Sequence, residues 1–496
     1  MDEMECKTMK NEASITPKGE NTGDGTPAIQ WNQIDWTKAE DFVSRLQTRI
    51  SKAKIANKNN LVKRLQHLLV NSFYGKALAV RTVTTNRGKH TPGVDKVLWP
   101  SDNRKMEAIL SLNKGSYKAK PLRRIYIPKK NGKLRPLSIP TMYDRAMQAL
   151  YSLALDPVAE ATSDLNSYGF RKGRACQDAR QQIFCNTAKR YQAQWNLEGD
   201  IKGCFDNISH EWLMNNIPMD KRILKQFLKA GFVFNERLFP SEYGTPQGGV
   251  ISPILANMTL NGMERLVKDR YPYGTKVNLV RYADDFVVST PDQKTAEAVK
   301  ELLIPFLAER GLELSEEKTL ITHIEEGYDF LGWNFRKYDG KMLIKPSKTS
   351  IKAIKEKIRK VILDDGLAMT QDDLIQRLNP ILRGWSNYHK CAVSSEIFGE
   401  VDAYIFQTLW IWAKRRHHNK GNGWRRHRYW HRKGNKGWVF CTEQNTLFRM
   451  SSVKIKRHVK VKADKNPYID TQYFRDRKEK IGIIRERGVR DKRYYL

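Results

Sequence analysis

The sequence lacks the features of a membrane or secreted protein. No apolar run approaches the roughly 18 residues that a bilayer-spanning helix needs, and no signal-peptide pattern opens the chain, so we expect no membrane partner. The six cysteines are scattered, without a Cys-x-x-Cys pair. Their spacing favours a reducing compartment such as the cytoplasm and argues against a zinc site.

Acidic residues are in the minority. The 496 residues include 88 Lys and Arg against 54 Asp and Glu, which gives a formal net charge of +34. A field of this size indicates a polyanionic partner, either nucleic acid or an anionic membrane surface. The 12 Trp and 20 Tyr residues suit stacking on bases and sugars. The length predicts two to four domains.

Composition divides the chain into regions. Residues 1–30 are polar and are predicted to be disordered. Ordered helical spacing begins near Trp31, and strands and helices alternate from about residue 120 to 340. After Pro346 an apolar stripe among lysines predicts a helical domain with a basic face. From Ile411 onward 26 Lys and Arg stand against 7 Asp and Glu, which predicts a nucleic-acid-binding region.

The most informative motif is Tyr282-Ala283-Asp284-Asp285. Its β-branched flanks predict a hairpin with the acidic pair at its tip. Adjacent carboxylates repel each other, and a fold tolerates them best when a cation is bound between them. A third acid, Asp200, lies upstream, and three carboxylates from two strands suit a pair of Mg²⁺ ions that run nucleotidyl transfer. Taken alone, the tetrapeptide fits a solvated turn equally well.

Other segments carry candidate contacts with a nucleotide. Residues 123–137 predict two strands joined by a basic Asn-Gly turn, which would hold Lys129 and Arg135 on a mobile hairpin able to close on a triphosphate. An ordinary basic hairpin is the alternative. Phe205 is placed to pack against a sugar and exclude a 2′-hydroxyl, unless it is a core aromatic. Gln247, in a Gly-rich turn that opens a helix, can hydrogen-bond without adding charge.

Four weaker signals follow. Lys318 is either a surface lysine or the group that protonates the leaving pyrophosphate. Residues 166–174 alternate aromatics with Arg and Gly, which suits contacts of Tyr168 and Arg171 with a template strand. The segment Phe330-Leu331-Gly332-Trp333 would brace a primer end or lie in the core. The clustered histidines lie among Arg and Trp, and they are predicted to face nucleic acid rather than a metal: His417, His418, His427 and His431.

The ordered series of motifs resembles a reverse transcriptase. The series consists of the basic hairpin, the Asp200 segment, Pro246-Gln247-Gly248-Gly249, the Tyr282 motif, the Lys318 segment and Phe330-Leu331-Gly332-Trp333. Asn379-Pro380-Ile381-Leu382-Arg383-Gly384-Trp385-Ser386-Asn387-Tyr388-His389 resembles the signature of a maturase domain, and residues 456–468 resemble the DNA-binding stretch after it. Over roughly residues 31–480 the chain is therefore similar to group II intron-encoded reverse transcriptase/maturases.

The resemblance implies an α+β fold, in which a right-hand polymerase of fingers and palm precedes a mostly α-helical thumb. The implied regions are a helical extension and the start of the fingers at 31–115, fingers and palm at 116–340, the maturase domain at 341–410 and a basic DNA- or RNA-binding region at 411–496. Asp200, Asp284 and Asp285, with Ile201 beside them, would bind two Mg²⁺ ions. The maturase residues that would contact RNA are Arg383, Trp385, Tyr388 and His389.

The implied partners are the parent group II intron RNA, a DNA target, an RNA template with a DNA primer, and dNTPs. The implied location is the bacterial cytoplasm or nucleoid, or an organelle. Many relatives continue into an HNH-type endonuclease with paired Cys and His ligands. This sequence shows no such pair, so we expect the primer for first-strand synthesis to come from elsewhere.

Two other interpretations stay open. One is a reverse transcriptase domesticated for defence or repair, without an intron. The other is an RNA-binding splicing factor with an inactive polymerase, against which the intact acids weigh.

Overall fold

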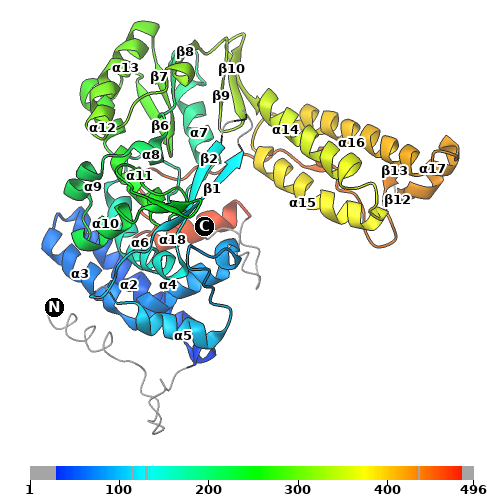
Figure 1. The fold of residues 1–496 in the computed structure, drawn as a ribbon. Coiled ribbons are helices and arrows are strands. Elements are labelled where there is room, and N and C mark those ends of the chain that lie inside the picture. The colour runs from blue at the N-terminus through cyan, green and yellow to red at the C-terminus, as the bar shows by residue number, and fades with distance from the viewer. Residues whose placement is uncertain (1–29, 114, 129–131, 133, 434–435, 483–496) are drawn as a thin grey trace.

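The computed structural model describes residues 30–482 except 114, 129–131, 133 and 434–435, so nearly all of the predicted tail 1–30 lies outside the described residues. The molecule consists of a large body and a projecting arm (Figure 1). The body contains helices, two four-stranded sheets and a three-stranded sheet, whereas the arm is mostly helical. The predicted α+β class and the order of body before helical arm are confirmed.

Amphipathic helices form the base of the body. The carboxylate of Asp35 accepts a hydrogen bond from the amide of Lys38 at 3.0 Å and so caps the first long helix, α2. Phe42, Leu46 and Ile50 lie one turn apart on α2, and all three are buried, where α2 packs against α6. The helices of this layer are α2 (Trp36–Ile55), α3 (Asn59–Asn71), α4 (Phe73–Thr85), α5 (Asp102–Ser111) and α6 (Met142–Thr162).

The central sheet carries the acidic motif. Its strand order is β6-β7-β3-β8, and all neighbours are antiparallel. Val280 and Val287 pack in a hydrophobic cluster with residues of α7, whereas Leu279 and Val288 pack in another cluster with residues of α13. Both faces are therefore covered. The elements are β3 (Trp195–Gly199), β6 (Asn278–Tyr282), β7 (Asp285–Thr290), β8 (Leu320–His323), α7 (Cys176–Thr187), α11 (Ser252–Leu260), α12 (Met263–Arg270) and α13 (Gln293–Ala308).

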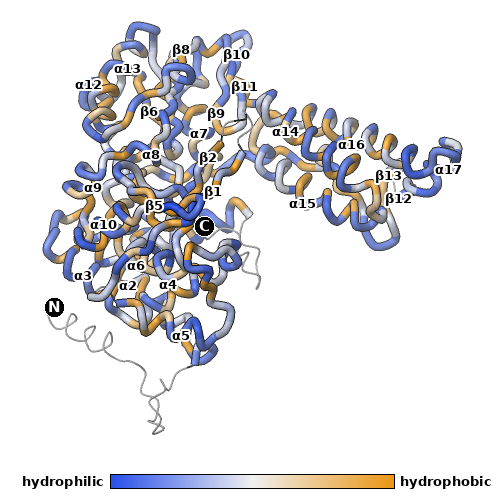
Figure 2. Tube along the Cα trace, viewed as in Figure 1, coloured by the Kyte–Doolittle hydropathy of each residue, from blue (hydrophilic) through white to orange (hydrophobic). Residues whose placement is uncertain are grey.

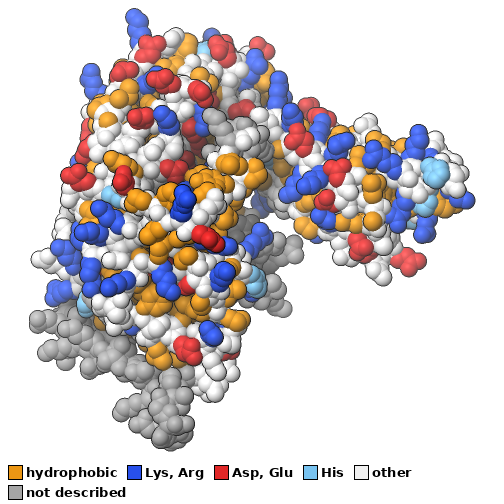
Figure 3. Space-filling view, viewed as in Figure 1, with side chains coloured by type: hydrophobic (Ala, Val, Ile, Leu, Met, Phe, Trp, Pro, Cys, Tyr) orange, Lys and Arg blue, Asp and Glu red, His pale blue; other side chains and the backbone are white. Residues whose placement is uncertain are grey.

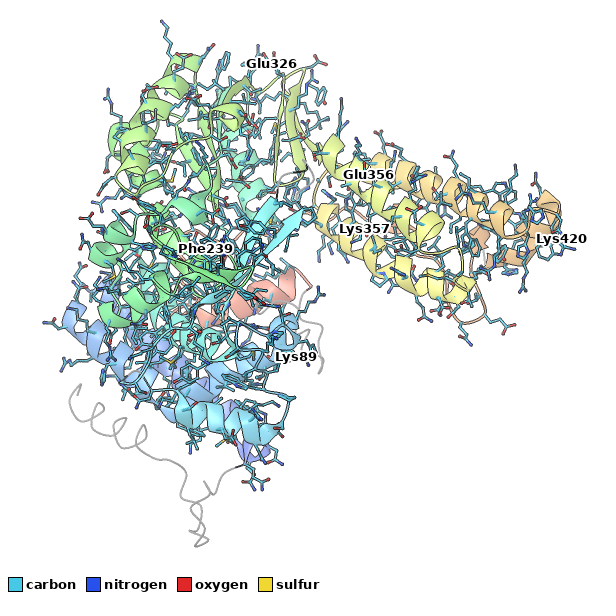
Figure 4. All side chains as sticks on the ribbon, in the orientation of Figure 1. Lys89, Phe239, Glu326, Glu356, Lys357 and Lys420 are labelled. Atoms are coloured by element: carbon cyan, nitrogen blue, oxygen red, sulfur yellow. The ribbon has the colours of Figure 1, made fainter. Side chains whose placement is uncertain are left out.

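A second sheet, with the order β2-β1-β4-β5, contains the predicted basic hairpin. β1 pairs with β2 in antiparallel register from Arg123↔Ile139 to Pro128↔Leu134. Leu238 and Phe239 remain exposed on this sheet, and Figure 4 labels Phe239. The elements are β1 (Leu122–Pro128), β2 (Leu134–Ile139), β4 (Phe232–Phe234), β5 (Arg237–Phe239), α8 (Cys204–Asn207), α9 (His210–Asn216) and α10 (Lys221–Leu228).

The arm has a hydrophobic core of its own. Apolar residues alternate with polar ones along its helices (Figure 2), and the apolar side chains, Trp412 among them, form a separate buried cluster. Lys and Arg side chains spread over the arm, with histidines at its tip (Figure 3). The elements are α14 (Lys348–Arg359), a π-helical turn (Lys360–Asp364), α15 (Gln371–His389), α16 (Ser395–Arg416), α17 (Asn422–Tyr429), β12 (Trp430–Lys433) and β13 (Lys436–Phe440).

Two predicted boundaries are wrong. The boundary at 340 cuts the hairpin that joins β10 (Trp333–Tyr338) to β11 (Lys341–Pro346), in a sheet with β9 (Tyr328–Phe330), so the arm begins with α14. The boundary at 410 falls inside α16. Tyr429, Trp430 and Phe440, beyond that boundary, complete the arm core. Local composition reveals the increase in basic residues near 410, but it does not reveal that the hydrophobic core of the arm continues past this position.

The C-terminal segment returns to the body. Asp178 of α7 accepts hydrogen bonds from His458 at 2.9 Å, from the amide of Val461 at 2.8 Å and from Arg477 at 2.6 Å. Arg477 belongs to the last described helix, α18 (Thr471–Lys480). Asn466 bonds to Ser51 of α2 at 3.0 Å. The described part of the predicted basic region 411–496 is therefore not one separate unit, because its first residues belong to the arm and residues 458–480 contact the body.

Candidate active site

The two adjacent acids lie at a tight hairpin tip, as predicted. Tyr282 at the end of β6 pairs with Asp285 at the start of β7, so Ala283 and Asp284 form the turn. Asp200 follows directly after β3, and the last residue of that strand, Gly199, pairs with Phe286 of β7. Neighbouring strands therefore bring the three acids to one end of the central sheet.

A buried arginine holds the turn in an unusual backbone conformation. Ala283 has φ = 58°, in the left-handed region that disfavours residues with a side chain. The guanidinium of Arg281, which is fully buried, donates to the carbonyl of Ala283 at 3.1 Å, to Asn257 at 3.2 Å and to Asn261 at 3.0 Å. Burial lowers the pKa of Arg281 to about 10, so it stays charged at neutral pH. No motif predicted a role for Arg281; the available signal is an arginine inside an apolar strand.

The segment predicted to contact template supports this turn instead. Tyr168 is buried, and its amide donates to the carbonyl of Arg281 at 2.9 Å. A Cβ on Gly169 would lie 2.3 Å from the amide nitrogen of Ala283, so only glycine fits there. Arg171 is buried and forms two hydrogen bonds of 2.8 Å with the carboxylate of Glu160. The template assignment of Tyr168 and Arg171 is therefore wrong, because neither side chain reaches the surface.

The clustered acids oppose each other's ionisation. Desolvation, Asp284 and Asp200 together raise the pKa of Asp285 to about 7, although the residue as a whole is exposed. Burial and Asp200 also raise the pKa of Asp284, and Arg135 and Lys318 partly offset that rise. A cation near these carboxylates would remove the electrostatic penalty.

Lys318 forms an ion pair with one of the acids. Its ammonium nitrogen lies 2.7 Å from Asp200 Oδ2, and this hydrogen bond raises the pKa of Lys318. Within the described residues no group of three or more His, Cys, Asp or Glu side chains is arranged to hold a metal ion. The acids have the hard oxygen donors that Mg²⁺ prefers. For Asp200 to share a cation with its neighbours, its ion pair with Lys318 has to open.

The backbone beside Asp200 is already in use. Ile201, which the sequence analysis placed in the metal site, has its side chain buried and forms an isolated bridge with Leu314. The carbonyl of Asp200 accepts a hydrogen bond from the amide of Ser315 at 2.8 Å. Because the Ile201 side chain is apolar and buried, Ile201 could contact a metal ion only through its own backbone.

Two of the predicted nucleotide contacts, Phe205 and Gln247, lie in segments that are joined to each other and to β2. Phe205 is half-buried and meets the ring of Phe170 edge-on, with centroids 6.2 Å apart. Gln247 donates to Asp206 at 2.9 Å, and its carbonyl accepts from the amide of Ser138 in β2 at 2.8 Å. Gln247 thus links the basic hairpin to the Phe205 segment.

The basic hairpin contributes one described cation. Arg135 is exposed on β2 and close enough to influence the charge of Asp284. Lys129 lies outside the described residues.

The segment Phe330-Leu331-Gly332-Trp333 joins body to arm. Phe330 and Trp333 are buried, so a primer contact through these two side chains is excluded. The ring of Trp333 stacks on Tyr388 with centroids 4.5 Å apart, and the Tyr388 hydroxyl donates to the carbonyl of Leu331 at 2.9 Å. Half-exposed Leu331 and Gly332 remain candidates for primer contact.

The maturase-signature residues likewise include some that are packed at the joint between body and arm and one that is exposed. His389 is buried against Trp333 and Trp385, and burial lowers its pKa to about 4. Trp385 is half-buried and donates to Ser350 at 3.2 Å. The RNA-contact assignment is wrong for His389, and Tyr388 and Trp385 are engaged in packing at the joint. Arg383 is exposed.

The arm-tip histidines have separate surroundings. His417 bonds to the hydroxyl of Tyr429 at 2.6 Å, and His427 meets Trp438 edge-on. His418 and His431 are both exposed and lie close to Arg residues in the sequence. They stay candidates for contact with nucleic acid.

The raised pKa of Asp285 makes stability depend on pH. Folding favours the protonated form of Asp285. The contribution of this carboxyl to the free energy of unfolding is therefore fully present below about pH 4 and is lost as the pH rises through about 7. Asp285→Asn removes the cost of ionising this carboxyl in the folded state. In the presence of a chelator at pH 8, urea titration should give the variant a free energy of unfolding about 1 kcal/mol larger than that of the parent, after allowance for solvent screening. The difference should vanish near pH 4. Asp41→Asn, in an exposed position of α2, is the control, and an Asp285→Asn protein no more stable at pH 8 contradicts the electrostatics.

Three family profiles match the chain. They describe an N-terminal domain of reverse transcriptase at residues 31–112, a reverse transcriptase (RNA-dependent DNA polymerase) at 127–335 and a group II intron, maturase-specific domain at 351–430. The candidate acids lie inside the second match and Arg383 inside the third. Within the described residues, no helix is both long and apolar enough to cross a membrane.

Two curated relatives match much of the chain. Group II intron-encoded protein LtrA of Lactococcus lactis subsp. cremoris is 31% identical over 69% of this chain and 73% of that protein. Protein YkfC of Escherichia coli K12 is 31% identical over 59% of this chain and 87% of that protein. The chain therefore belongs to the group II intron-encoded proteins, with a reverse transcriptase and a maturase domain in one polypeptide.

Proposed function

We propose that Asp200, Asp284 and Asp285 hold two Mg²⁺ ions and that the chain extends a DNA primer on an RNA template by a two-metal mechanism. The observation that carries this proposal is the convergence of Asp200, Asp284 and Asp285 at one end of the sheet, where desolvation together with the charges of Asp284 and Asp200 raises the pKa of Asp285 to about 7. Bound Mg²⁺ would activate the primer 3′-hydroxyl and stabilise the departing pyrophosphate.

The neighbouring side chains have distinct roles in this proposal. Arg135 on the basic hairpin, together with Lys129, would bind the triphosphate of the incoming dNTP and neutralise its charge. The half-buried ring of Phe205 would lie against the sugar and exclude a 2′-hydroxyl. Gln247 holds the hairpin and the Phe205 segment in register. Lys318, once released from Asp200, would hold a proton for the leaving pyrophosphate.

The partners follow from the two domains and the charge. The arm would bind the parent intron RNA to assist splicing, and the body would copy that RNA into DNA at a DNA target. The net charge of +34 and the Lys and Arg residues spread over the arm (Figure 3) support a polyanionic partner. The described cysteines are all free thiols, which fits a reducing cytoplasm.

Substitution of the acids separates polymerisation from binding. Asp284→Asn and Asp200→Asn should each reduce primer extension by several orders of magnitude, because each removes a charge needed for the metal ions. Binding of intron RNA, measured by filter retention, should persist. The control is Asp339→Asn, in the exposed β10–β11 turn, where φ of 48° suits asparagine. Near-normal extension by either acid variant would refute the metal assignment.

Substitution of Phe205 tests sugar selection. Phe205→Ala should increase the incorporation of rNTPs relative to dNTPs, since the ring would no longer meet the 2′-hydroxyl. Phe170→Ala removes the exposed ring that contacts Phe205 and is the matched control, for which we expect a smaller change. Competitive incorporation on one annealed primer–template measures the ratio. An unchanged ratio in Phe205→Ala would return that residue to a packing role.

A further inference from the structure

The arm contains a pocket that the polymerase mechanism does not use. It lies between α15, the β12–β13 hairpin and the segment 446–452, and its volume is about 320 Å³. This volume is at the lower end of the roughly 300–1,000 Å³ usual for ligand sites, which suits a single nucleotide better than a duplex. Among the described residues, no acidic side chain lines it.

The lining combines cations with apolar side chains. The cationic residues are Arg383, Lys433 and Arg449, and all three are exposed. The apolar members are Val439, Leu447 and Phe448, and the Arg383 guanidinium carbon lies 5.2 Å from the centre of the Phe448 ring. Cations beside an aromatic face are the combination that binds a phosphate together with its base.

The maturase signature builds this pocket directly. Asn379 donates to the carbonyl of Thr446 at 3.0 Å and accepts from the amide of Phe448 at 2.7 Å, so it holds the lining segment against α15. Arg383 lies one helical turn beyond Asn379 and therefore on the same side of the helix. The positioning amide and the cation of one sequence motif thus serve one pocket.

Other contacts make the lining rigid. The ammonium of Lys433 donates to the hydroxyl of Thr446 at 2.8 Å. Asp402 of α16 accepts from the amides of Met450 at 3.0 Å and Ser451 at 2.9 Å, so the nearby carboxylate is occupied by backbone amides. A pocket fixed in this way can discriminate by shape, whereas a flexible basic surface binds any phosphate.

We propose that this pocket binds one unpaired nucleotide of a structured RNA, with the base against the apolar floor and the phosphate at the Arg383, Lys433 and Arg449 rim. The proposal rests on the binding of intron RNA by the arm and adds which feature of that RNA is recognised. A base inside a duplex is stacked and paired, and it cannot enter a pocket of this size. The occupant is therefore a loop or bulge nucleotide.

The test compares two RNA probes on the full chain. One probe is an RNA hairpin with an unpaired loop, and the other is a continuous RNA duplex with the same number of phosphates. Fluorescence anisotropy should show that the parent protein prefers the hairpin. Arg383→Gln with Arg449→Gln should weaken hairpin binding about tenfold, the scale of a lost base contact with its phosphate, and duplex binding much less.

A matched control separates the pocket from general charge. Lys357→Gln with Arg359→Gln removes two positive charges from exposed positions of α14, outside the pocket lining (Figure 4 labels Lys357). It should weaken both probes to the same extent, through lost counterion release. Thermal unfolding of every variant verifies the fold first.

A second variant tests the floor without changing charge. Phe448→Leu should remove the preference for the hairpin and leave the salt dependence unaltered. If the pocket variants weaken both probes alike, or keep the parent's preference for the hairpin, the pocket proposal is overturned. If the parent binds neither probe, RNA binding by the arm is itself refuted. Primer extension, scored separately, bears only on the palm acids.

Discussion

Repulsion among three carboxylates is the constraint on which the rest of the body depends. Asp200, Asp284 and Asp285 meet where β3 and β6 end and β7 begins, and desolvation together with the charges of Asp284 and Asp200 raises the pKa of Asp285 to about 7. Such a cluster is unfavourable without a cation, so the surrounding fold has to hold it in place. Arg281 does so from inside the sheet, through its hydrogen bond to the turn carbonyl of Ala283.

Support of the turn at Ala283 explains why most of the segment 166–174, which was predicted to contact nucleic acid, packs inside the body instead. Gly169 allows the 166–168 segment to approach the turn, and Asn257 of α11 bonds to the carbonyl of Gly169 at 2.8 Å and also to Arg281. Helix α11, which follows the Gly-rich turn, is thus joined to the segment 166–174 next to the turn at Ala283. These contacts hold the turn at Ala283 and Asp284 in place, while Phe205 is half-buried and Arg135 is exposed.

The sequence predicts the position of the adjacent acids at a hairpin tip because the signal for the hairpin is local. A β-branched flank on each side of Asp284 and Asp285 predicts a hairpin. The residues before Asp200 likewise predict a strand that ends next to this acid. Residue type alone does not separate packing from binding, since aromatic and basic side chains serve both. For that reason the sequence predicts contacts of Tyr168, Trp333 and His389 with nucleic acid, whereas all three are buried in the structure.

Contacts between distant parts of the chain explain the remaining errors. The bond between Asp178 and Arg477 joins residues 299 positions apart, and no local pattern of charge reveals it. Arg281 likewise bonds to Asn257 of α11, 24 positions away, and to Asn261 directly after that helix, 20 positions away. The helical arm was predicted because its apolar stripe repeats locally, but its end was misplaced where α16 continues past residue 410.

The most direct test of the account is a crystal structure with an RNA template, a DNA primer, a non-reactive dNTP and Mn²⁺ in place of Mg²⁺, with the metal located by its anomalous scattering. We predict metal between the carboxylates of Asp200, Asp284 and Asp285, and Lys318 displaced from its 2.7 Å contact with Asp200 towards the triphosphate. Metal bound away from these acids, with the ion pair between Lys318 and Asp200 intact, would contradict the account.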